Sequence, residues 1–355
     1  MNFFEQEKLS AIKAKEEAQW ITFAPFVFQA TRVLRDSGIL TTVESHREGI
    51  TLEALTSEVK LPAYGVRVLV EAGLGIGLLM LNEGKYKITK TTYFILHDDL
   101  TKVNMDFTHD VCYQGMYFLD ESIKQGKPEG LKVFGEWPTI YEALSTSLPD
   151  KAKKSWFSFD HFYSDYAFPE VLPLVYHHKP RTLLDIGGNT GKWSMQSFGH
   201  DPDVRITIMD LPGYVDTARD KIEQLGYGDR ISFYPCNLLD EKQKFPSGFD
   251  AIWMSQFLDC FSEKEIVSIL KRCKLALSPT GNIFILETFW DRQRFEASAF
   301  SLQQTSLYFT VMANGNSQMY DSKIFVKCIE QAGLRVVEEK DYVGVSHTLL
   351  TCRPI

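Results

Sequence analysis

Leu183-Leu-Asp-Ile-Gly-Gly-Asn-Thr-Gly191 is the stretch of the sequence that decides the fold. The apolar run at 182–186 predicts a buried strand, and the pattern that starts near Lys192 predicts a helix. Between them, Gly187 and Gly188 allow the backbone to approach a ligand closely, and Asn189 tolerates the left-handed region. In an open α/β sheet, ligands bind at this carboxyl end of the strands, beside the free N–H groups of a helix. We therefore predict a ligand-binding turn.

The spacing of the glycines narrows the class of ligand. A dinucleotide fingerprint has its outer glycines five positions apart. Gly187 and Gly191 are four apart, and Asp185 lies two residues before the first of them. This pattern resembles motif I of class I S-adenosylmethionine-dependent methyltransferases, in which the acid-x-glycine turn faces the methionine part of the cofactor. A tight turn without a ligand is the alternative for this pattern alone.

Composition bounds the rest of the chain. A length of 355 residues suits two domains, and 44% hydrophobic residues can form a sizeable core. The formal charge of −8 and the lack of a basic patch disfavour a nucleic-acid partner. Six cysteines without C-x-x-C spacing predict reduced thiols and no metal site. Because no leader and no long apolar stretch is present, we expect a cytoplasmic protein that does not bind membranes.

The first hundred residues predict a winged helix. Helical patterns cover 5–17, 20–34, 51–59 and 63–73, and a hairpin signal follows at Asn82-Glu-Gly84. The segment in the place of a DNA-recognition helix, 63–72, offers only Arg67 as a basic residue among valines and leucines. Since exposed apolar helices would form a large patch, we expect this domain to form a homodimer rather than to read DNA.

We divide the chain into a winged-helix dimerisation domain at 1–100, a helical linker and pocket roof at 101–178, and a methyltransferase domain at 179–355. The middle segment is helical and rich in aromatic residues, which are core residues in most proteins. Because it directly precedes the glycine turn, some of these side chains, including Phe162 and Tyr163, are candidates for a substrate pocket.

After Gly191, strand and helix patterns alternate as a doubly wound parallel sheet requires. Asp210 ends the second strand, 25 residues after Asp185, where a carboxylate can accept both ribose hydroxyls of an adenosine. Asn237 and Leu238 follow the third strand, where they could hold adenine, and Ser255-Gln256 follows the fourth. The expected strands are Arg205–Asp210, Ile231–Pro235, Phe249–Met254, Asn282–Glu287, Leu334–Glu339 and Ser346–Thr351.

Several motifs occur in the order of one family. They are the glycine turn, the Asp210-Leu211-Pro212 exit, the runs at 229–233 and 261–265, and Gly281-Asn-Ile-x-Ile-x-Glu287. With the winged-helix start, the whole chain resembles the small-molecule O-methyltransferases of plant phenolic and bacterial polyketide tailoring pathways. The resemblance implies a Rossmann-like seven-stranded domain, S-adenosyl-L-methionine as cofactor and an intertwined homodimer. The residues placed at the cofactor are Asp185, Gly187, Gly188, Gly191, Asp210, Leu211, Asn237, Leu238, Ser255 and Gln256.

The chain departs from this family at the catalytic positions. Plant members carry a histidine-aspartate-tryptophan run whose histidine takes the phenol proton, whereas this chain has Asp259-Cys260-Phe261. Glu287 matches one of the two glutamates that orient that histidine, and the second falls at Met319. We therefore place Asp259 and Glu287 as catalytic candidates. The substrate pocket is completed by Trp290, Met312 and Met319, in and near the loop region 290–316.

These residues predict a methyltransferase that acts on a hydroxyl of an aromatic or polyketide-like small molecule. Burial beside Phe257, Leu258 and Phe261 should raise the pKa of Asp259 far enough for it to act as a base. Catalysis by alignment alone is an alternative, as is a relative that has lost methyl transfer, such as a hydroxylase or a pseudoenzyme. A winged-helix regulator is the alternative from another class.

Overall fold

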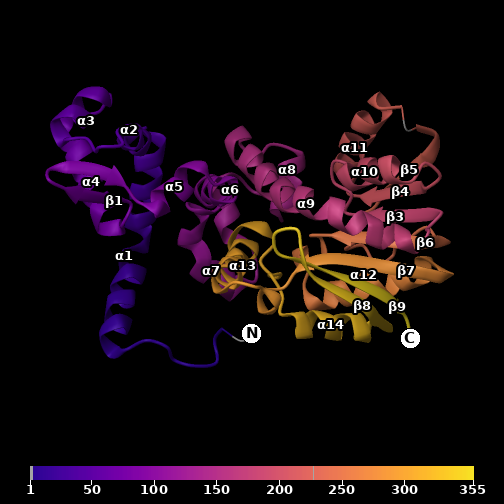
Figure 1. Ribbon diagram of the computed structural model, residues 1–355. Helices are drawn as coiled ribbons and strands as arrows, with labels where there is room; N and C mark the ends of the chain where they lie inside the picture. The colour runs from indigo at the N-terminus through magenta and orange to yellow at the C-terminus, as the bar shows by residue number, and fades with distance from the viewer. Residues whose placement is uncertain (1–2, 227) are drawn as a thin grey trace. The chain divides into compact units, whose positions relative to one another are not determined.

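The computed structural model describes residues 3–226 and 228–355. The chain forms two compact units, residues 4–108 and residues 109–355 (Figure 1). The first is helical with a small hairpin, and the second contains the large sheet. No helix in the part of the chain that the structure describes is long and apolar enough to cross a membrane.

The N-terminal unit begins with one long helix rather than the two that we predicted at 5–17 and 20–34. Helix α1 runs unbroken from Ala11 to Asp36, because the Ser10 side chain accepts the backbone N–H of Lys13 and good helix formers follow. Pro25 lies inside the helix without ending it. Gly38, at φ +80°, turns the chain into the next helix.

Three further helices and a hairpin follow; the last two helices and the hairpin were predicted, and the helix at 39–45 was not. They are α2 (Ile39–Ser45), α3 (Leu52–Glu58), α4 (Ala63–Ile76), β1 (Leu79–Asn82) and β2 (Lys85–Ile88), followed by α5 (Lys90–His97) and α6 (Asp99–Phe107). Leu34, Leu40, Leu55, Val66 and Val70 pack together as the core of this unit. Residues 11–26 of α1 contribute nothing to that core and are exposed throughout.

The second unit opens with helical segments. They are the π-helical turn Thr108–Cys112, the 3₁₀ turns Gly115–Phe118 and Glu129–Val133, and the helices α7 (Leu119–Gln125), α8 (Ile140–Ser145) and α9 (Asp150–His177). As expected for residues 101–178, this stretch is mainly helical. Helix α9 leads directly into the strand of the glycine turn.

The sheet has seven strands in the order β5-β4-β3-β6-β7-β9-β8. The first five strands in this order are parallel, and β9 and β8 are antiparallel, which makes the sheet Rossmann-like and mostly parallel. The strands are β3 (Thr182–Ile186), β4 (Arg205–Asp210), β5 (Ile231–Pro235), β6 (Phe249–Ser255), β7 (Leu277–Thr288), β8 (Leu334–Val343) and β9 (His347–Pro354). The predicted bounds of β3, β4 and β5 are confirmed; β7 begins five residues earlier than predicted.

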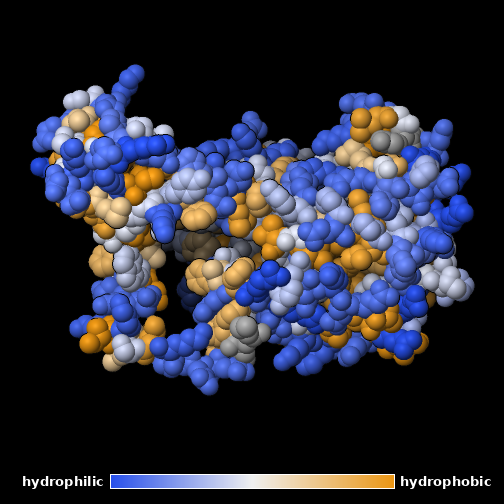
Figure 2. Space-filling view, in the orientation of Figure 1, coloured by the Kyte–Doolittle hydropathy of each residue, from blue (hydrophilic) through white to orange (hydrophobic). Residues whose placement is uncertain are grey.

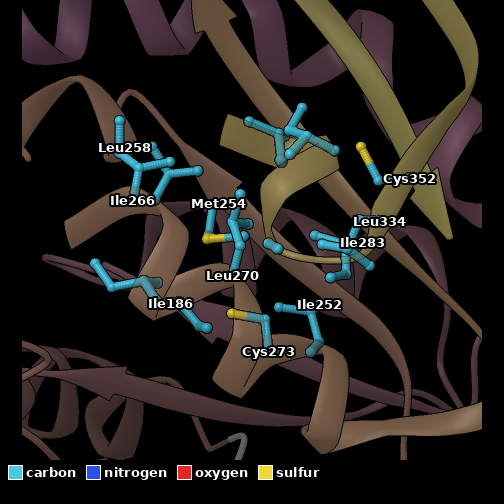
Figure 3. Packing of buried hydrophobic residues seen from close by; sticks show 14 of the residues in the cluster. Ile186, Ile252, Met254, Leu258, Ile266, Leu270, Cys273, Ile283, Leu334 and Cys352 are labelled. Atoms are coloured by element: carbon cyan, nitrogen blue, oxygen red, sulfur yellow. The ribbon is translucent and has the colours of Figure 1, made fainter. Parts of the chain in front are cut away.

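Helices cover both faces of this sheet, so alternate residues of a strand point into different cores. In β6, Ile252 and Met254 pack against α12 (Glu263–Ala276) and α14 (Ser322–Gln331). Figure 3 shows this layer, with Leu270 and Cys273 of α12 beside the strand residues. Ala251 and Trp253 face the other core, formed with α9, α10 (Lys192–His200) and α11 (Pro212–Gln224). There the rings of Trp193 and Trp253 stack 3.8 Å apart.

The buried strand residues should dominate the stability of the second unit. Ile285 on β7 is 0% exposed, whereas Ile123 on α7 is 64% exposed. We expect Ile285→Ala to lower the free energy of unfolding by about 2 to 5 kcal/mol, through lost burial and a new cavity. The matched change Ile123→Ala should stay within about 0.5 kcal/mol. Denaturant titration of both variants, followed by tryptophan fluorescence, measures the difference; equal losses would contradict this assignment of the core.

Candidate functional site

The glycine turn lies between β3 and α10, at the carboxyl ends of the parallel strands. Gly187 adopts φ +73° and Asn189 φ +48°, in the left-handed region that the sequence predicted for this turn. A Cβ at Gly187 would lie 2.2 Å from the Phe257 ring, which approaches from the loop after β6. A Cβ at Gly191 would lie 2.8 Å from Ile222 of α11. Glycine is therefore needed at both positions for close packing.

The Asp185 side chain forms its hydrogen bond within the fold, to the helix that follows the turn. Its side chain is buried, and its Oδ2 accepts a hydrogen bond of 2.6 Å from the Ser194 hydroxyl of α10. Burial raises the pKa of Asp185 to about 7. The carboxyl therefore joins β3 to the first turn of α10. Its predicted contact with the methionine part of a cofactor stays a prediction.

Asp210 ends β4 beside this turn. Its Oδ2 accepts the backbone N–H of Asn189 at 2.9 Å, and its Oδ1 accepts that of Leu211 at 2.7 Å. Burial raises the pKa of Asp210 to about 6, against the lowering effect of these two hydrogen bonds. A carboxylate held in this way has further lone pairs with which to accept hydroxyl groups.

The predicted residues after β5 and β6 lie at the same edge of the sheet. Asn237 is exposed, with its Oδ1 accepting the N–H of Leu239 at 3.0 Å. Leu238 is buried, and its carbonyl accepts a hydrogen bond from Arg272. The Ser255 hydroxyl is buried and makes no hydrogen bond to any described residue. It is therefore placed to be satisfied by a ligand.

Gln256 connects three elements. Its backbone is left-handed at φ +46°, and its Oε1 lies 2.8 Å from Nε2 of His347 on β9. Its Nε2 donates over 3.5 Å to the Asp160 carbonyl of α9. Burial lowers the pKa of His347 to about 4, so this imidazole is neutral at physiological pH. The Gln256 side chain is thus occupied by protein partners.

Asp259 and Glu287 form a buried acidic pair. Glu287, 1% exposed on β7, accepts the backbone N–H groups of Phe257 and Leu258 with Oε1, at 3.0 and 2.7 Å. Its Oε2 is buried without a hydrogen bond to the described residues. Asp259 is 6% exposed and accepts from the Cys260 thiol at 3.4 Å.

Burial raises the pKa of both carboxyls, and the charge of Asp259 raises that of Glu287 further. Hydrogen bonds from the backbone of residues 257–259 oppose this shift at Glu287 but do not cancel it. Each carboxyl is therefore protonated more readily than an exposed one.

Aromatic side chains surround this pair. Trp156 of α9 donates to the hydroxyl of Tyr308 at 2.7 Å, and Tyr308 is buried in α13 (Glu296–Tyr308). Burial raises the pKa of the Tyr141 hydroxyl, and the charge of Asp259 raises it further. The sequence left the aromatic residues of 101–178 as core residues or as part of a pocket roof. The helical spacing of Tyr141 gave no signal that its hydroxyl lies near Asp259.

The predicted pocket residues occupy different surroundings. Met312 is fully buried against Gly115, and the Met319 sulfur accepts from the Thr288 hydroxyl at 3.2 Å. Phe162 and Tyr163 are half-buried on α9, and Trp290 is half-buried in the turn after β7. Their contact with a substrate stays a prediction.

The comparisons with known proteins assign the fold and its family. A model of the O-methyltransferase domain matches residues 116–335, which is more than half of the chain. This chain belongs to that family. A Dimerisation2-like domain model matches residues 15–86 of the same chain. The methyltransferase match includes the glycine turn, Asp210, Asp259 and Glu287.

Proteins similar to this chain are named as methyltransferases of different atoms, carbon in one case and oxygen in others. L-Tyrosine C(3)-methyltransferase of Streptomyces lavendulae is 21% identical over 322 residues, covering 90% of this chain and 86% of the relative. The structure of the mitomycin 7-O-methyltransferase MmcR has a TM-score of 0.71 at 17% identity and covers 97% of this chain and 98% of its own. The neocarzinostatin O-methyltransferase NcsB1, solved with S-adenosylmethionine and a hydroxynaphthoic acid, has a TM-score of 0.68 at 17% identity, covering 94% and 96%. The family shared by these proteins is that of S-adenosylmethionine-dependent methyltransferases.

The packing of Gly187 against Phe257 gives a test of the turn. We expect Gly187→Ala to lower affinity for S-adenosylhomocysteine at least about tenfold, because a Cβ displaces Phe257 and strains the backbone by about 1 to 3 kcal/mol. Gly199 on α10 has open space around it, so Gly199→Ala is the matched control and should bind normally. Calorimetry on both variants decides the point. Normal binding by Gly187→Ala would contradict this role of the glycine.

Proposed function

We propose that this protein transfers the methyl group of S-adenosylmethionine to a hydroxyl of an aromatic or polyketide-like small molecule. The observation that carries the proposal is the buried Asp259–Glu287 pair, which lies next to the loop that covers the glycine turn. A carboxyl with a raised pKa is a stronger base than an exposed one, and it stands where the family's phenol-activating residue belongs.

The residues at the carboxyl ends of β3, β4 and β6 fit the cofactor. Asn189 Oδ1 and Ser255 Oγ are buried and make no hydrogen bond to the described residues, so they are available to exchange hydrogen bonds with the cofactor. Asp210 would hold the ribose hydroxyls, and the Asn237–Leu238 segment would lie at the adenine. When bound, the cofactor supplies an electrophilic methyl group on a sulfonium.

Asp259 accepts the proton of the substrate hydroxyl in this proposal. The O–H bond would break as the oxygen forms its bond to the methyl carbon, and the bond from that carbon to the cofactor's sulfur would break at the same time. The sulfur would keep the electron pair of that bond, S-adenosylhomocysteine would leave, and the proton would stay on the Asp259 carboxyl until solvent removes it. Glu287 holds Phe257 and Leu258 by their backbone N–H groups and so fixes where Asp259 points. The aromatic surroundings exclude water, which strengthens these interactions.

Replacing Asp210 tests the ribose contact. We expect Asp210→Ala to cost about 1.5 to 3 kcal/mol of S-adenosylhomocysteine binding, or roughly ten- to hundredfold in affinity. NADH should not bind to the wild-type protein. Calorimetry measures both, with the exposed Asp240→Ala as control. Unchanged affinity in Asp210→Ala would remove Asp210 from the ribose site.

Replacing Asp259 tests the chemistry. We expect Asp259→Asn to lower kcat by about 10² to 10⁴ without changing cofactor affinity. Because the pKa of Asp259 is raised, the wild-type rate should fall as pH decreases through that pKa and the base becomes protonated. A panel of phenols and labelled cofactor gives the rates, and NMR of the product identifies the methylated atom. Wild-type rates in the variant would exclude Asp259 as the base, and a C-methyl product would exclude O-methylation.

We also propose that the N-terminal unit forms a homodimer. Figure 2 shows hydrophobic side chains gathered on α1, where Trp20, Phe23 and Phe26 are 46%, 52% and 72% exposed. With Val68 and Leu69 of α4 they line an apolar groove of about 520 Å³. A patch of this kind marks an interface, and the Dimerisation2-like match covers it.

Light scattering at micromolar concentration should give twice the chain mass of 40.6 kDa. A charge in the groove, Phe26→Asp, should shift the mass toward that of the monomer, since an unpaired buried charge is costly. Leu275→Asp, on an exposed apolar residue of α12, is the control and should remain dimeric. A monomeric wild-type protein would overturn the proposal.

A further inference from the structure

We propose that Asp160 of the helix α9 accepts the α-ammonium group of the cofactor's methionine part, and that Gln256 and His347 hold Asp160 in position. Sequence reasoning did not single out Asp160, because it lies 25 residues before Asp185 in a stretch that reads as an ordinary helix. The inference rests on the proposed binding of S-adenosylmethionine.

The turn itself leaves the ammonium without a carboxylate. Asp185, the acid that the motif offers, is 2% exposed and is hydrogen-bonded to Ser194 inside the fold. Asp210 is engaged from the other side by the backbone N–H groups of Asn189 and Leu211. A primary ammonium carries three donors and no acceptor, so it requires oxygen atoms from another element.

Asp160 supplies such an oxygen. Its Oδ2 lies 3.4 Å from Nδ2 of Asn189, the same residue whose backbone N–H binds Asp210. The other side-chain atom of Asn189, Oδ1, is buried and makes no hydrogen bond to the described residues. A carboxylate and an amide oxygen therefore meet beside the turn. Asn189 bridges Asp160 and Asp210. Asp210 is thus placed for the ribose of the cofactor, and Asp160 is placed for the ammonium group of its amino acid part.

The charges around Asp160 favour a cation. Asp259 and Asp165 are negative neighbours that act on it, and Lys192 is the positive one. Lys192 is already paired with Asp165 at 2.8 Å, and His161 on the next position is neutral because burial lowers its pKa to about 4. Burial and the charge of Asp259 raise the pKa of Asp160 to about 7. A bound ammonium would stabilise its ionised form.

Gln256 and His347 fix the backbone of α9 at Asp160. The Gln256 amide donates to the Asp160 carbonyl, and its oxygen accepts from His347 Nε2, which carries the proton because His347 is neutral and Gln256 Oε1 is an acceptor. The backbone of Gln256 is left-handed, at φ +46°, and such strain is found at functional sites. Gly344 lies just before β9 and packs closely against α9: a Cβ added at this glycine would lie only 2.9 Å from the backbone nitrogen of Ala167. This end of the sheet therefore contacts α9 directly. Gln256 and His347 are positioning residues in this arrangement.

Two ligands separate an ammonium contact from a general structural role. S-adenosylhomocysteine carries the amino acid, whereas 5′-methylthioadenosine has the same nucleoside and thioether without it. By calorimetry, Asp160→Asn should lower affinity for S-adenosylhomocysteine about ten- to hundredfold and leave affinity for 5′-methylthioadenosine within about twofold. The control Glu170→Gln, an exposed acid on the same helix, should change neither. An equal loss for both ligands, or no loss for either, would overturn the proposal.

A measurement on the wild-type protein does not depend on how the variant folds. The des-amino analogue of S-adenosylhomocysteine, in which hydrogen replaces the ammonium, should bind about ten- to hundredfold more weakly than the parent. Equal binding of the two would refute an ammonium contact. Gln256→Leu should show the same selective loss for S-adenosylhomocysteine over 5′-methylthioadenosine; a loss common to both ligands would remove its positioning role. Each result is independent of whether any phenol is methylated.

Discussion

The two hydrogen bonds from the backbone of the loop after β6 to Oε1 of Glu287 are the constraint on which the site depends. They anchor Phe257 and Leu258 to β7, and the adjoining residues follow from that. Phe257 covers Gly187, Gln256 turns toward α9 and β9, and Asp259 is held in a dry environment. A carboxyl that in plant relatives orients a histidine here orders a backbone segment. In the proposed function this loop carries the base, and Glu287 determines the shape of the loop.

With Asp259 as the proposed base in place of a histidine, the electrostatics of the reaction change. A histidine base becomes a cation when it takes a proton, whereas a carboxylate becomes neutral. In a site with Asp160 and Glu287 nearby, the second outcome lowers the total negative charge, so protonation relieves repulsion as the reaction proceeds. The surrounding acids thereby assist a base that would be too weak in water. Burial of these acids, which lowers the stability of the free protein, is the reason that Asp259 becomes a stronger base.

The sequence predicted the sheet better than the site. The bounds of β3, β4 and β5 are confirmed because their apolar runs are short and ended by turn residues. The sequence predicted two helices where the structure has the single helix α1, because the composition changes from charged to apolar along it. The helical backbone continues through this change without a break. Asp160 escaped notice for a different reason: a helical acid has no local pattern that tells a cofactor contact from a solvated face. The proposal for Asp160 depends on its place beside Asn189 of the turn, which the sequence does not show.

Assembly through the exposed part of α1 would make the stability of this protein depend on its concentration. Residues 11–26 span about 24 Å at 1.5 Å per residue, and none of them is covered by the unit to which they belong. If a second copy covers them, part of the apolar burial that stabilises the N-terminal unit exists only in the assembled state. The melting temperature then rises with protein concentration, and dilution destabilises the chain without any change in its sequence or solvent. Assembly would act on this helix as a ligand does, through mass action.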